Sequence, residues 1–149
     1  MEVAGITGKV ALVTGAAQGI GRTVAAALAE RGALVAAVDQ HAEGVRDLVA
    51  ELRAGGHQAA AFPADASDSA AVEAMVDQIE REVGPVEILV NVAGLLRTGP
   101  IETLSSNAAG VPRMQMSAYA ASKAAATMFT KCLGLEYARH NIRCNVVSP

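Results

Sequence analysis

The chain has 149 residues, the size of one ordinary domain, so we expect a single hydrophobic core. Hydrophobic residues make up 52% of the chain and charged residues 18%, which excludes global disorder. No apolar run approaches the roughly 20 residues of a membrane span, and the net charge of −3 offers no basic surface to phosphate backbones, so neither a membrane nor nucleic acid is an expected partner.

The residues before the first apolar run do not have the cationic stretch and apolar run of a signal or transit peptide. We therefore expect a cytoplasmic protein. Its two cysteines, Cys132 and Cys144, are expected to be reduced and to pack in the core. No metal site is predicted.

Two hydrophobic periods alternate over the first 92 residues. Short β-rich runs predict strands at residues 10–14, 34–39, 58–63 and 86–92. Apolar residues at helical spacing predict helices between them, at residues 19–31, 43–54 and 69–82. Asp68 or Ser69 is expected to cap the third helix, and the Gly55-Gly56 pair to end the second with a left-handed cap.

The same spacing predicts which helical faces point inward. The first helix is expected to bury Ile20, Val24, Ala27 and Leu28. The second and third helices are expected to bury Val45, Leu48, Val49 and Leu52, and Val72, Met75, Val76, Ile79 and Val83.

A stretch rich in Gly, Pro and Ser follows at residues 94–110, then a long predicted helix at 117–140 and a last strand at 142–147. Apolar strands that alternate with amphipathic helices are typical of a parallel sheet covered on both faces. With right-handed crossovers, this pattern predicts a doubly wound, Rossmann-like α/β sheet.

The turn between the first strand and the first helix is rich in glycine, with the sequence Thr-Gly-Ala-Ala-Gln-Gly-Ile-Gly at residues 14–21. Glycine permits a tight turn and close approach of a pyrophosphate, and the helix start supplies N–H groups and the positive end of its dipole. The predicted cofactor-binding residues here are Gly15, Gln18, Gly19, Ile20 and Gly21. The alternative is a glycine-rich turn without a ligand.

Asp39 ends the second predicted strand, eighteen positions beyond Gly21. A carboxylate there accepts hydrogen bonds from an adenosine ribose diol and repels a 2′-phosphate, which favours NAD over NADP. Arg22, just beyond the turn, leaves NADP open. The alternative for Asp39 is a solvated loop carboxylate.

Tyr119 and Lys123 lie one helical turn apart and so share one face of the long helix. A free phenol has a pKa near 10, and a neighbouring ammonium favours the phenolate, so the pair suits general acid–base chemistry. Lys123 could also reach the ribose hydroxyls of a bound nucleotide. On an isolated helix the same spacing is more often a surface pair.

These motifs together resemble the short-chain dehydrogenase/reductase family. The resemblance rests on the glycine turn, Asp39, Tyr119 and Lys123, and on two further motifs, Asp65-Ala66 and Asn91-Val92-Ala93-Gly94. It implies that Asp65 and Ala66 contact adenine, and that Asn91, Ala93 and Gly94 lie along the nicotinamide. It also implies that Ser106, thirteen residues before Tyr119, holds the substrate hydroxyl; from the residues alone, Ser106 is a turn residue.

Four runs, at residues 87–94, 106–113, 128–136 and 141–145, resemble more narrowly the dihydrodiol dehydrogenases of catecholate siderophore synthesis. This implies NAD-dependent oxidation of a dihydrodiol acid to the aromatic catechol. We expect Arg113, or less readily Arg97, to bind the acid's carboxylate, although each could be a surface charge. Alternatives are a dehydrogenase or reductase for another alcohol or ketone, such as a 3-oxoacyl chain, and a non-catalytic nucleotide-binding remnant.

The resemblance also implies residues that this sequence does not contain. Only eleven residues, 95–105, separate Gly94 from Ser106, where the family has a helix with a catalytic asparagine and then a strand. A parallel crossover needs about a dozen residues or more. We expect residues 1–149 to belong to one domain. We expect the given sequence to join two segments of a longer chain between Ser105 and Ser106, rather than to carry a true deletion there. We also expect the longer chain to continue after Pro149. The resemblance implies a tetramer formed through the helix that bears Tyr119.

Overall fold

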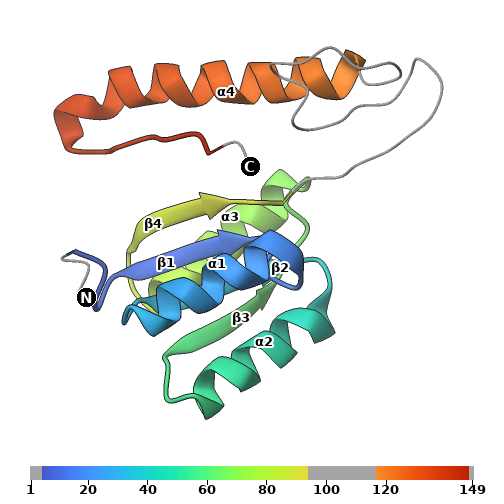
Figure 1. Ribbon diagram of the computed structural model, residues 1–149, viewed down its shortest axis with the longest axis vertical. Coiled ribbons are helices and arrows are strands. Elements are labelled where there is room, and N and C mark those ends of the chain that lie inside the picture. Colours follow the sequence, from blue (N-terminus) through green and yellow to red (C-terminus); the bar gives the residue numbers. More distant parts are fainter. Residues whose placement is uncertain (1–4, 94–116, 148–149) are drawn as a thin grey trace. The chain divides into compact units, whose positions relative to one another are not determined.

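The structure is a computed structural model that describes residues 5–93 and 117–147, with the backbone alone for residues 117–119. The chain forms two compact units, Met1–Gly94 and Leu95–Pro149. The elements of the first unit are β1 (Val10–Thr14), α1 (Gly19–Glu30), β2 (Leu34–Asp39), α2 (Ala42–Ala54), β3 (Ala59–Pro63), α3 (Ser69–Glu82) and β4 (Val86–Asn91) (Figure 1). The described part of the second unit contains α4 (Ser117–Tyr137) and a short 3-10 helix, η2 (Ala138–His140).

The four strands form one parallel sheet in the order β3-β2-β1-β4. Thr14 lies opposite Val38 and Asn91, and Asp39 lies opposite Pro63, so the carboxyl ends of the strands meet at one edge. The chain moves outward from β1 to β3 and then returns to the other side of β1. The topological switch point therefore lies between β1 and β4, where open α/β sheets bind their ligands.

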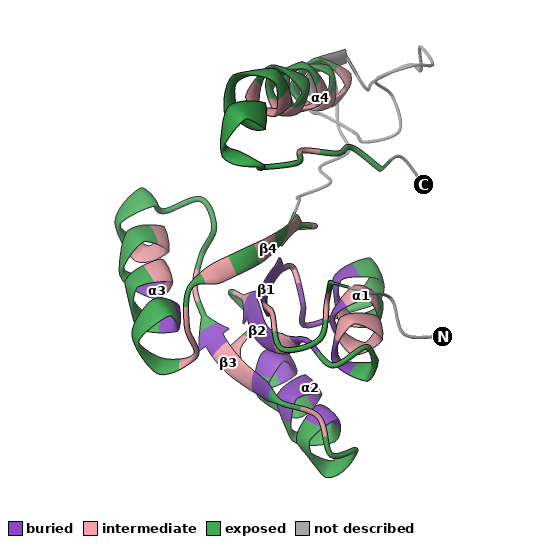
Figure 2. Cartoon of the chain, turned by 90° about the vertical axis from the view of Figure 1, so that its left-hand side faces the viewer, coloured by how far each residue is buried: buried purple, intermediate pink, exposed green. Residues whose placement is uncertain are grey.

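Hydrophobic residues pack on both faces of the sheet. One cluster joins the strands to α1 and α2 and includes Ala11, Val13, Val35, Val45 and Leu48. A second cluster joins the opposite face to α3 and includes Leu12, Val38, Phe62, Met75 and Ile79. Figure 2 shows α3 on one side of the sheet and α1 and α2 on the other. The predicted doubly wound α/β sheet, with helices on both faces, is confirmed.

The buried face of α1 differs from the predicted one. Its buried residues are Gly21, Ala25 and Ala29, spaced four apart, whereas Ile20 is 58% exposed. Small residues let the helix axis approach the sheet closely, so the stripe with the least bulk faces inward and Ile20 faces away. The predicted inward position of Ile20 is wrong, and Val24, Ala27 and Leu28 are only half-buried.

Glycines end α1 and α2 as the capping rules predict. In α2 the left-handed residue is Gly56, with φ 83°, and the N–H of His57 donates to the carbonyl of Leu52 at 2.9 Å. In α1 the equivalent residues are Gly32, with φ 83°, and Ala33, which donates to Leu28 at 3.1 Å. Both are Schellman motifs, in which a glycine without a Cβ turns the chain toward the next strand.

Asp68 caps α3, as predicted. Its Oδ1 accepts from the N–H groups of Ala70 at 2.9 Å and Ala71 at 3.2 Å, which have no acceptor within the helix. We expect Asp68→Ala to lower the free energy of unfolding by about 1 kcal/mol, measured by urea titration. Asp68→Asn keeps a side-chain acceptor and should lose much less; equal losses in the two variants would contradict the capping role.

Two predictions for residues outside the centre of the sheet are wrong, the strand at residues 142–147 and the core position of Cys132. Among the described strands β4 is at the edge of the sheet, and it alternates between half-buried and exposed residues, with Leu89 58% exposed. Residues 142–147 form no strand. A parallel strand exists only through hydrogen bonds to a neighbouring strand, and the described part of the second unit contains helices alone.

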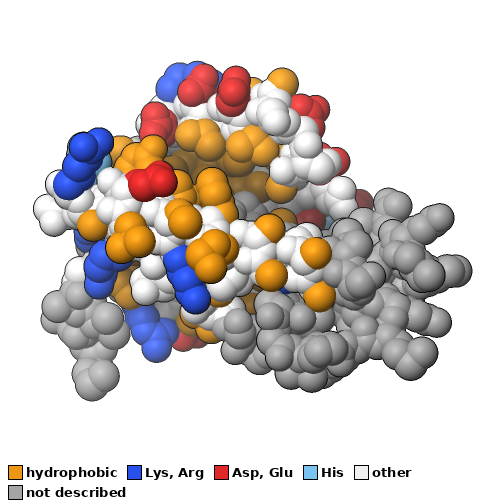
Figure 3. Space-filling view, turned by 90° about the horizontal axis from the view of Figure 1, so that it is seen from above, with side chains coloured by type: hydrophobic (Ala, Val, Ile, Leu, Met, Phe, Trp, Pro, Cys, Tyr) orange, Lys and Arg blue, Asp and Glu red, His pale blue; other side chains and the backbone are white. Residues whose placement is uncertain are grey.

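Cys132 is exposed and Cys144 half-buried, so the predicted core position of Cys132 is also wrong. It belongs to α4, whose exposed large hydrophobic residues include Met128, Phe129 and Leu135. A space-filling view shows many hydrophobic side chains at the surface (Figure 3). In the described ranges, no helix is long and apolar enough to cross a membrane.

Candidate nucleotide site at the carboxyl edge of the sheet

The glycine turn connects β1 to α1 at the switch point. Gly15 has φ 69°, and a Cβ on it would lie 2.9 Å from the backbone nitrogen of Ala93. A Cβ on Gly21 would overlap the carbonyl oxygen of Gly15. Gly19 has φ 53°, with open space around the position of its missing Cβ. Two glycines are therefore required by close backbone packing, and the third by its left-handed conformation beside an open surface.

α1 begins at this turn and leaves its first N–H groups without acceptors inside the helix. Gln18 precedes the helix in an extended conformation, and the first N–H to bond backward is that of Arg22, to the Gln18 carbonyl at 3.2 Å. Free N–H groups and the positive end of the helix dipole make this position suitable for a pyrophosphate. The predicted turn residues thus lie together at one helix start.

Asp39 is held against the glycine turn. Its Oδ2 accepts from the N–H of Ala17 at 3.1 Å, and its Oδ1 accepts from the N–H of His41 at 3.0 Å. Each carboxylate oxygen has a further lone pair, so Asp39 can still accept from a ligand hydroxyl. The side chain is fixed beside the turn rather than solvated in a loop, which favours the binding interpretation of this residue.

Gly44, in the first turn of α2, is a site-supporting residue that the sequence analysis missed. A Cβ on it would lie 2.6 Å from Nδ1 of His41 and 2.8 Å from Cβ of Ala17. Gly44 therefore lets α2 pack against the two residues whose N–H groups hold Asp39. The sequence does contain an indication of this role, because a glycine inside a predicted helix lowers its helix propensity and therefore suggests a packing reason for the glycine.

Thr14 connects the two strands that flank the switch point, and it too was not singled out from the sequence as a site residue. Among the described residues, its side chain is the one buried polar group. Its Oγ1 accepts from the N–H groups of Val92 and Ala93, both at 3.1 Å, and makes a longer contact of 3.4 Å to Oδ1 of Asn91. Thr14 thereby fixes the end of β4 beside the turn.

We expect Thr14→Val to lower the free energy of unfolding by about 1–3 kcal/mol, because the two N–H groups lose their acceptor in a partly buried place. Urea titration measures the change, and amide hydrogen exchange of Val92 and Ala93 locates it. Thr14→Ser keeps the hydroxyl and is the matched control. Faster exchange at these amides in the Ser variant than in the Val variant would contradict the role of Oγ1.

Asp65 and Ala66 follow β3 at the same edge. Hydrogen bonds from the N–H of Ser67 at 2.8 Å and from its hydroxyl at 2.7 Å hold the pKa of Asp65 below its ordinary value. The exposed carboxylate therefore stays ionised and is fixed in a local turn. The N–H of Ala64 donates to the Asp39 carbonyl at 3.1 Å, which ties this loop to the end of β2.

A cavity of about 370 Å³ lies on the α3 face of the sheet and reaches its carboxyl edge. Its lining is mostly apolar, with Leu12, Val38, Val72, Met75, Val76, Val86, Leu89 and two alanines, and the polar residues are Thr14 and Asn91. One of the alanines is Ala66. An apolar recess with a few polar groups at a switch point is the usual form of a small-molecule site.

The predicted site residues fall into three groups. The structure brings Gly15, Gln18, Gly19, Ile20, Gly21, Asp39, Asp65, Ala66, Asn91 and Ala93 to the carboxyl edge within the first unit. Tyr119 and Lys123 lie in α4, one turn apart as predicted, and the side chain of Tyr119 is not described. Gly94, Arg97, Ser106, Arg113 and the junction after Ser105 lie outside the described residues.

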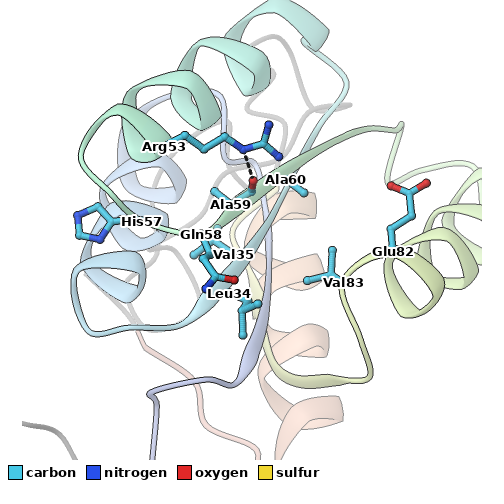
Figure 4. Close-up of a pocket in the computed structure, with 9 residues that line it drawn as sticks. All are labelled: Leu34, Val35, Arg53, His57, Gln58, Ala59, Ala60, Glu82 and Val83. Carbon is cyan, nitrogen blue, oxygen red and sulfur yellow. Dashed lines mark hydrogen bonds between the residues drawn. The ribbon is translucent and has the colours of Figure 1, made fainter.

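A second cavity, of about 340 Å³, opens at the opposite edge, where β2 and β3 begin (Figure 4). Its lining includes Arg53, His57 and Glu82, and Nε of Arg53 donates to the Ala59 carbonyl at 2.8 Å. Arg53 thus supports the connection from α2 to β3. Within residues 5–93 and 117–147, no group of three or more His, Cys, Asp or Glu side chains could hold a metal ion.

The parallel sheet, the glycine turn and the fixed Asp39 define a dinucleotide-binding type of site. The family model "short chain dehydrogenase" matches residues 9–106 and again 96–149, and the chain belongs to this family of oxidoreductases, which use nicotinamide cofactors.

Three relatives show how near the similarity comes to particular proteins. The chain is 50% identical to the 2,3-dihydro-2,3-dihydroxybenzoate dehydrogenase of Bacillus subtilis (strain 168), over 100% of this chain and 72% of that protein. It is 37% identical to the D-threitol dehydrogenase of Mycolicibacterium smegmatis, over 97% and 70%. The crystal structure of a gluconate 5-dehydrogenase from Burkholderia cenocepacia J2315, in complex with NADP and tartrate, superposes with a TM-score of 0.85 at 29% identity, over 93% of this chain and 69% of that one.

The matches extend over more aligned positions than the chain has residues. The similarity to the Bacillus protein extends over 187 aligned positions, whereas this chain has 149 residues, so the relative has residues in the matched span without a counterpart here. The two stretches matched by the family model overlap at residues 96–106.

Proposed function

We propose that the protein oxidises 2,3-dihydro-2,3-dihydroxybenzoate to 2,3-dihydroxybenzoate with NAD, as a step of catecholate siderophore biosynthesis. The 50% identity to the Bacillus enzyme over the whole chain is the observation that supports this substrate most strongly. The fixed carboxylate of Asp39 supports the choice of cofactor.

NAD fits the residues at the carboxyl edge and, when bound, supplies the hydride acceptor. The free N–H groups at the start of α1, around Gly19 and Ile20, would hold the pyrophosphate. Asp39 would accept from the adenosine ribose hydroxyls, while its charge disfavours a 2′-phosphate. Asp65 and Ala66 would contact adenine, and Asn91, Ala93 and Gly94 would line the nicotinamide side.

Tyr119, Lys123 and Ser106 would carry the proton chemistry. Tyr119 would take the proton of the ring C3 hydroxyl, and Ser106 would hold the same oxygen. Lys123 favours the phenolate form of Tyr119 and anchors the ribose. Arg113, or in second place Arg97, pairs with the carboxylate of the acid. Enolisation of the ketone product then yields the aromatic catechol, and the gain of aromaticity drives the reaction forward.

A second candidate substrate class is another alcohol or ketone, which includes a 3-oxoacyl chain. The similarity to D-threitol dehydrogenase and to the NADP-bound gluconate 5-dehydrogenase favours this class.

We further propose that residues 1–149 belong to one domain that is interrupted between Ser105 and Ser106. The two stretches matched by the family model agree with this proposal. If the interruption is a true deletion, the chain is a non-catalytic nucleotide-binding remnant. A cytoplasmic homotetramer is the proposed state.

The experiment is a spectrophotometric assay of NADH formation by the intact protein with the dihydrodiol acid, D-threitol and a 3-hydroxyacyl substrate in parallel. We expect the highest kcat/KM with the dihydrodiol acid and with NAD rather than NADP. A higher value with another alcohol would transfer the proposal to that substrate. Binding of NADH without turnover of any substrate would instead support the remnant.

A further inference from the structure

Arg22 and Glu51 form an ion pair between α1 and α2, close to the candidate nucleotide site. Nη2 of Arg22 lies 2.6 Å from Oε2 of Glu51, and its Nη1 donates to the carbonyl oxygen of Ala17 at 3.4 Å. The N–H of the same Ala17 donates to the Asp39 carboxylate. One residue of the glycine turn therefore lies between the Arg22 guanidinium and the carboxylate proposed to bind the adenosine ribose.

A guanidinium beside this position is the group that an adenosine 2′-phosphate would recruit. Arginine binds phosphate through two parallel N–H donors and neutralises its charge. In this structure Oε2 of Glu51 pairs with Nη2 of the guanidinium and offsets its charge, while Nη1 contacts the Ala17 carbonyl. The cation nearest the turn is thus engaged by the protein itself.

We propose that Glu51 is a specificity-determining positioning residue, which keeps Arg22 from a nucleotide 2′-phosphate and so adds to the preference for NAD over NADP. This inference rests on the proposed nucleotide site. Asp39 repels the extra phosphate directly, whereas Glu51 acts through Arg22. The two carboxylates lie on different elements, β2 and α2, and they are connected through Ala17 and Arg22.

The size of the effect is limited by solvent. The side chains of Arg22 and Glu51 are 30% and 67% exposed, and pairs of this kind are worth little in water. Glu51→Gln removes the charge and keeps the side-chain length, and the remaining contact to Ala17 keeps the guanidinium near the turn. We expect the Kd for NADPH to fall about two- to fivefold, the range that breaking such a pair releases.

The experiment measures the Kd values of NADH and NADPH by fluorescence titration of the full 149-residue chain. In Glu51→Gln, the Kd for NADPH should fall while the Kd for NADH stays unchanged, so the ratio of the first Kd to the second should fall. The charge-matched control is Glu87→Gln, because Glu87 pairs with Lys9 at 3.2 Å near the start of β4, away from the carboxyl edge. The double variant Arg22→Gln/Glu51→Gln should lose the gain for NADPH.

The outcomes separate this inference from the proposed function. An unchanged ratio in Glu51→Gln, with NADH still bound, would overturn the role of Glu51 alone. The same fall in the Kd ratio in Glu87→Gln would also overturn it, because the effect would then follow from the loss of any carboxylate. A gain in NADPH affinity that persists in the double variant would overturn it as well, because the effect would then not depend on Arg22. Failure of the wild-type chain to bind either nucleotide would overturn the proposed nucleotide site itself.

Discussion

Replacing Gly21 by alanine is expected to destabilise the first unit by about 3 kcal/mol or more and to lower its Tm by about 10 °C or more. The added Cβ would overlap the carbonyl oxygen of Gly15, and the next atoms it meets are also backbone. Backbone cannot rotate away as a flexible side chain can. Relief of the overlap requires α1 to move off the glycine turn, which would also displace the proposed pyrophosphate site.

Gly19→Ala is the matched control, because it adds the same methyl group in the same turn. Gly19 has φ 53° and open space around its missing Cβ, so its substitution costs only the left-handed strain, about 1–2 kcal/mol. Helix propensity alone predicts the opposite sign for Gly21, since alanine favours a helix by about 1 kcal/mol. Thermal melting of both variants, followed by circular dichroism, decides: a Gly21→Ala variant as stable as Gly19→Ala would contradict the packing role.

Replacing Tyr119 by phenylalanine is expected to lower kcat for the dihydrodiol acid by about 100- to 10,000-fold, the usual contribution of a positioned acid or base. The variant loses only the phenol oxygen, which is the atom proposed to take the substrate proton. The ring and the helical position are kept. Steady-state NADH formation measures the loss, and a fluorescence titration should show that NADH is still bound.

Tyr137→Phe is the control, because Tyr137 is the last residue of the same helix and is 44% exposed. Its kcat should equal that of the wild-type chain. Equal kcat values for Tyr119→Phe and the wild type would remove Tyr119 from the chemistry and leave the nucleotide site standing. Equal losses in the two tyrosine variants would point to α4 as a whole rather than to one proton-transfer group.

Much of the fold follows from local patterns. Strands and helices alternate as predicted over residues 10–91, and every predicted end lies within one residue of the observed end, because the spacing of apolar residues differs between strands and helices. The Asp68 cap and the glycine that ends α2 are also local, since a cap depends on atoms only a few residues away. For the same reason, the glycine turn and Asp39 could be recognised from spacing alone.

The wrong predictions share a different cause. Ile20 has the right spacing for an inward residue, but the small residues Gly21, Ala25 and Ala29 let α1 approach the sheet on another face. Residues 142–147 have the composition of a strand and no described partner strand in their unit. Both outcomes depend on the element that packs against the segment, and the spacing of apolar residues within the segment gives no information about that element.

Local sequence patterns are enough to give the order of the elements, the α/β class and the residue types gathered at the glycine turn. Tertiary structure alone decided how those residues are held: Thr14 ties β4 to the turn, Asp39 accepts from Ala17, and Arg22 pairs with Glu51. These contacts join residues that are 78, 22 and 29 positions apart in the sequence. Local hydrophobic spacing fixes each element, but only packing of the elements fixes which donor meets which acceptor.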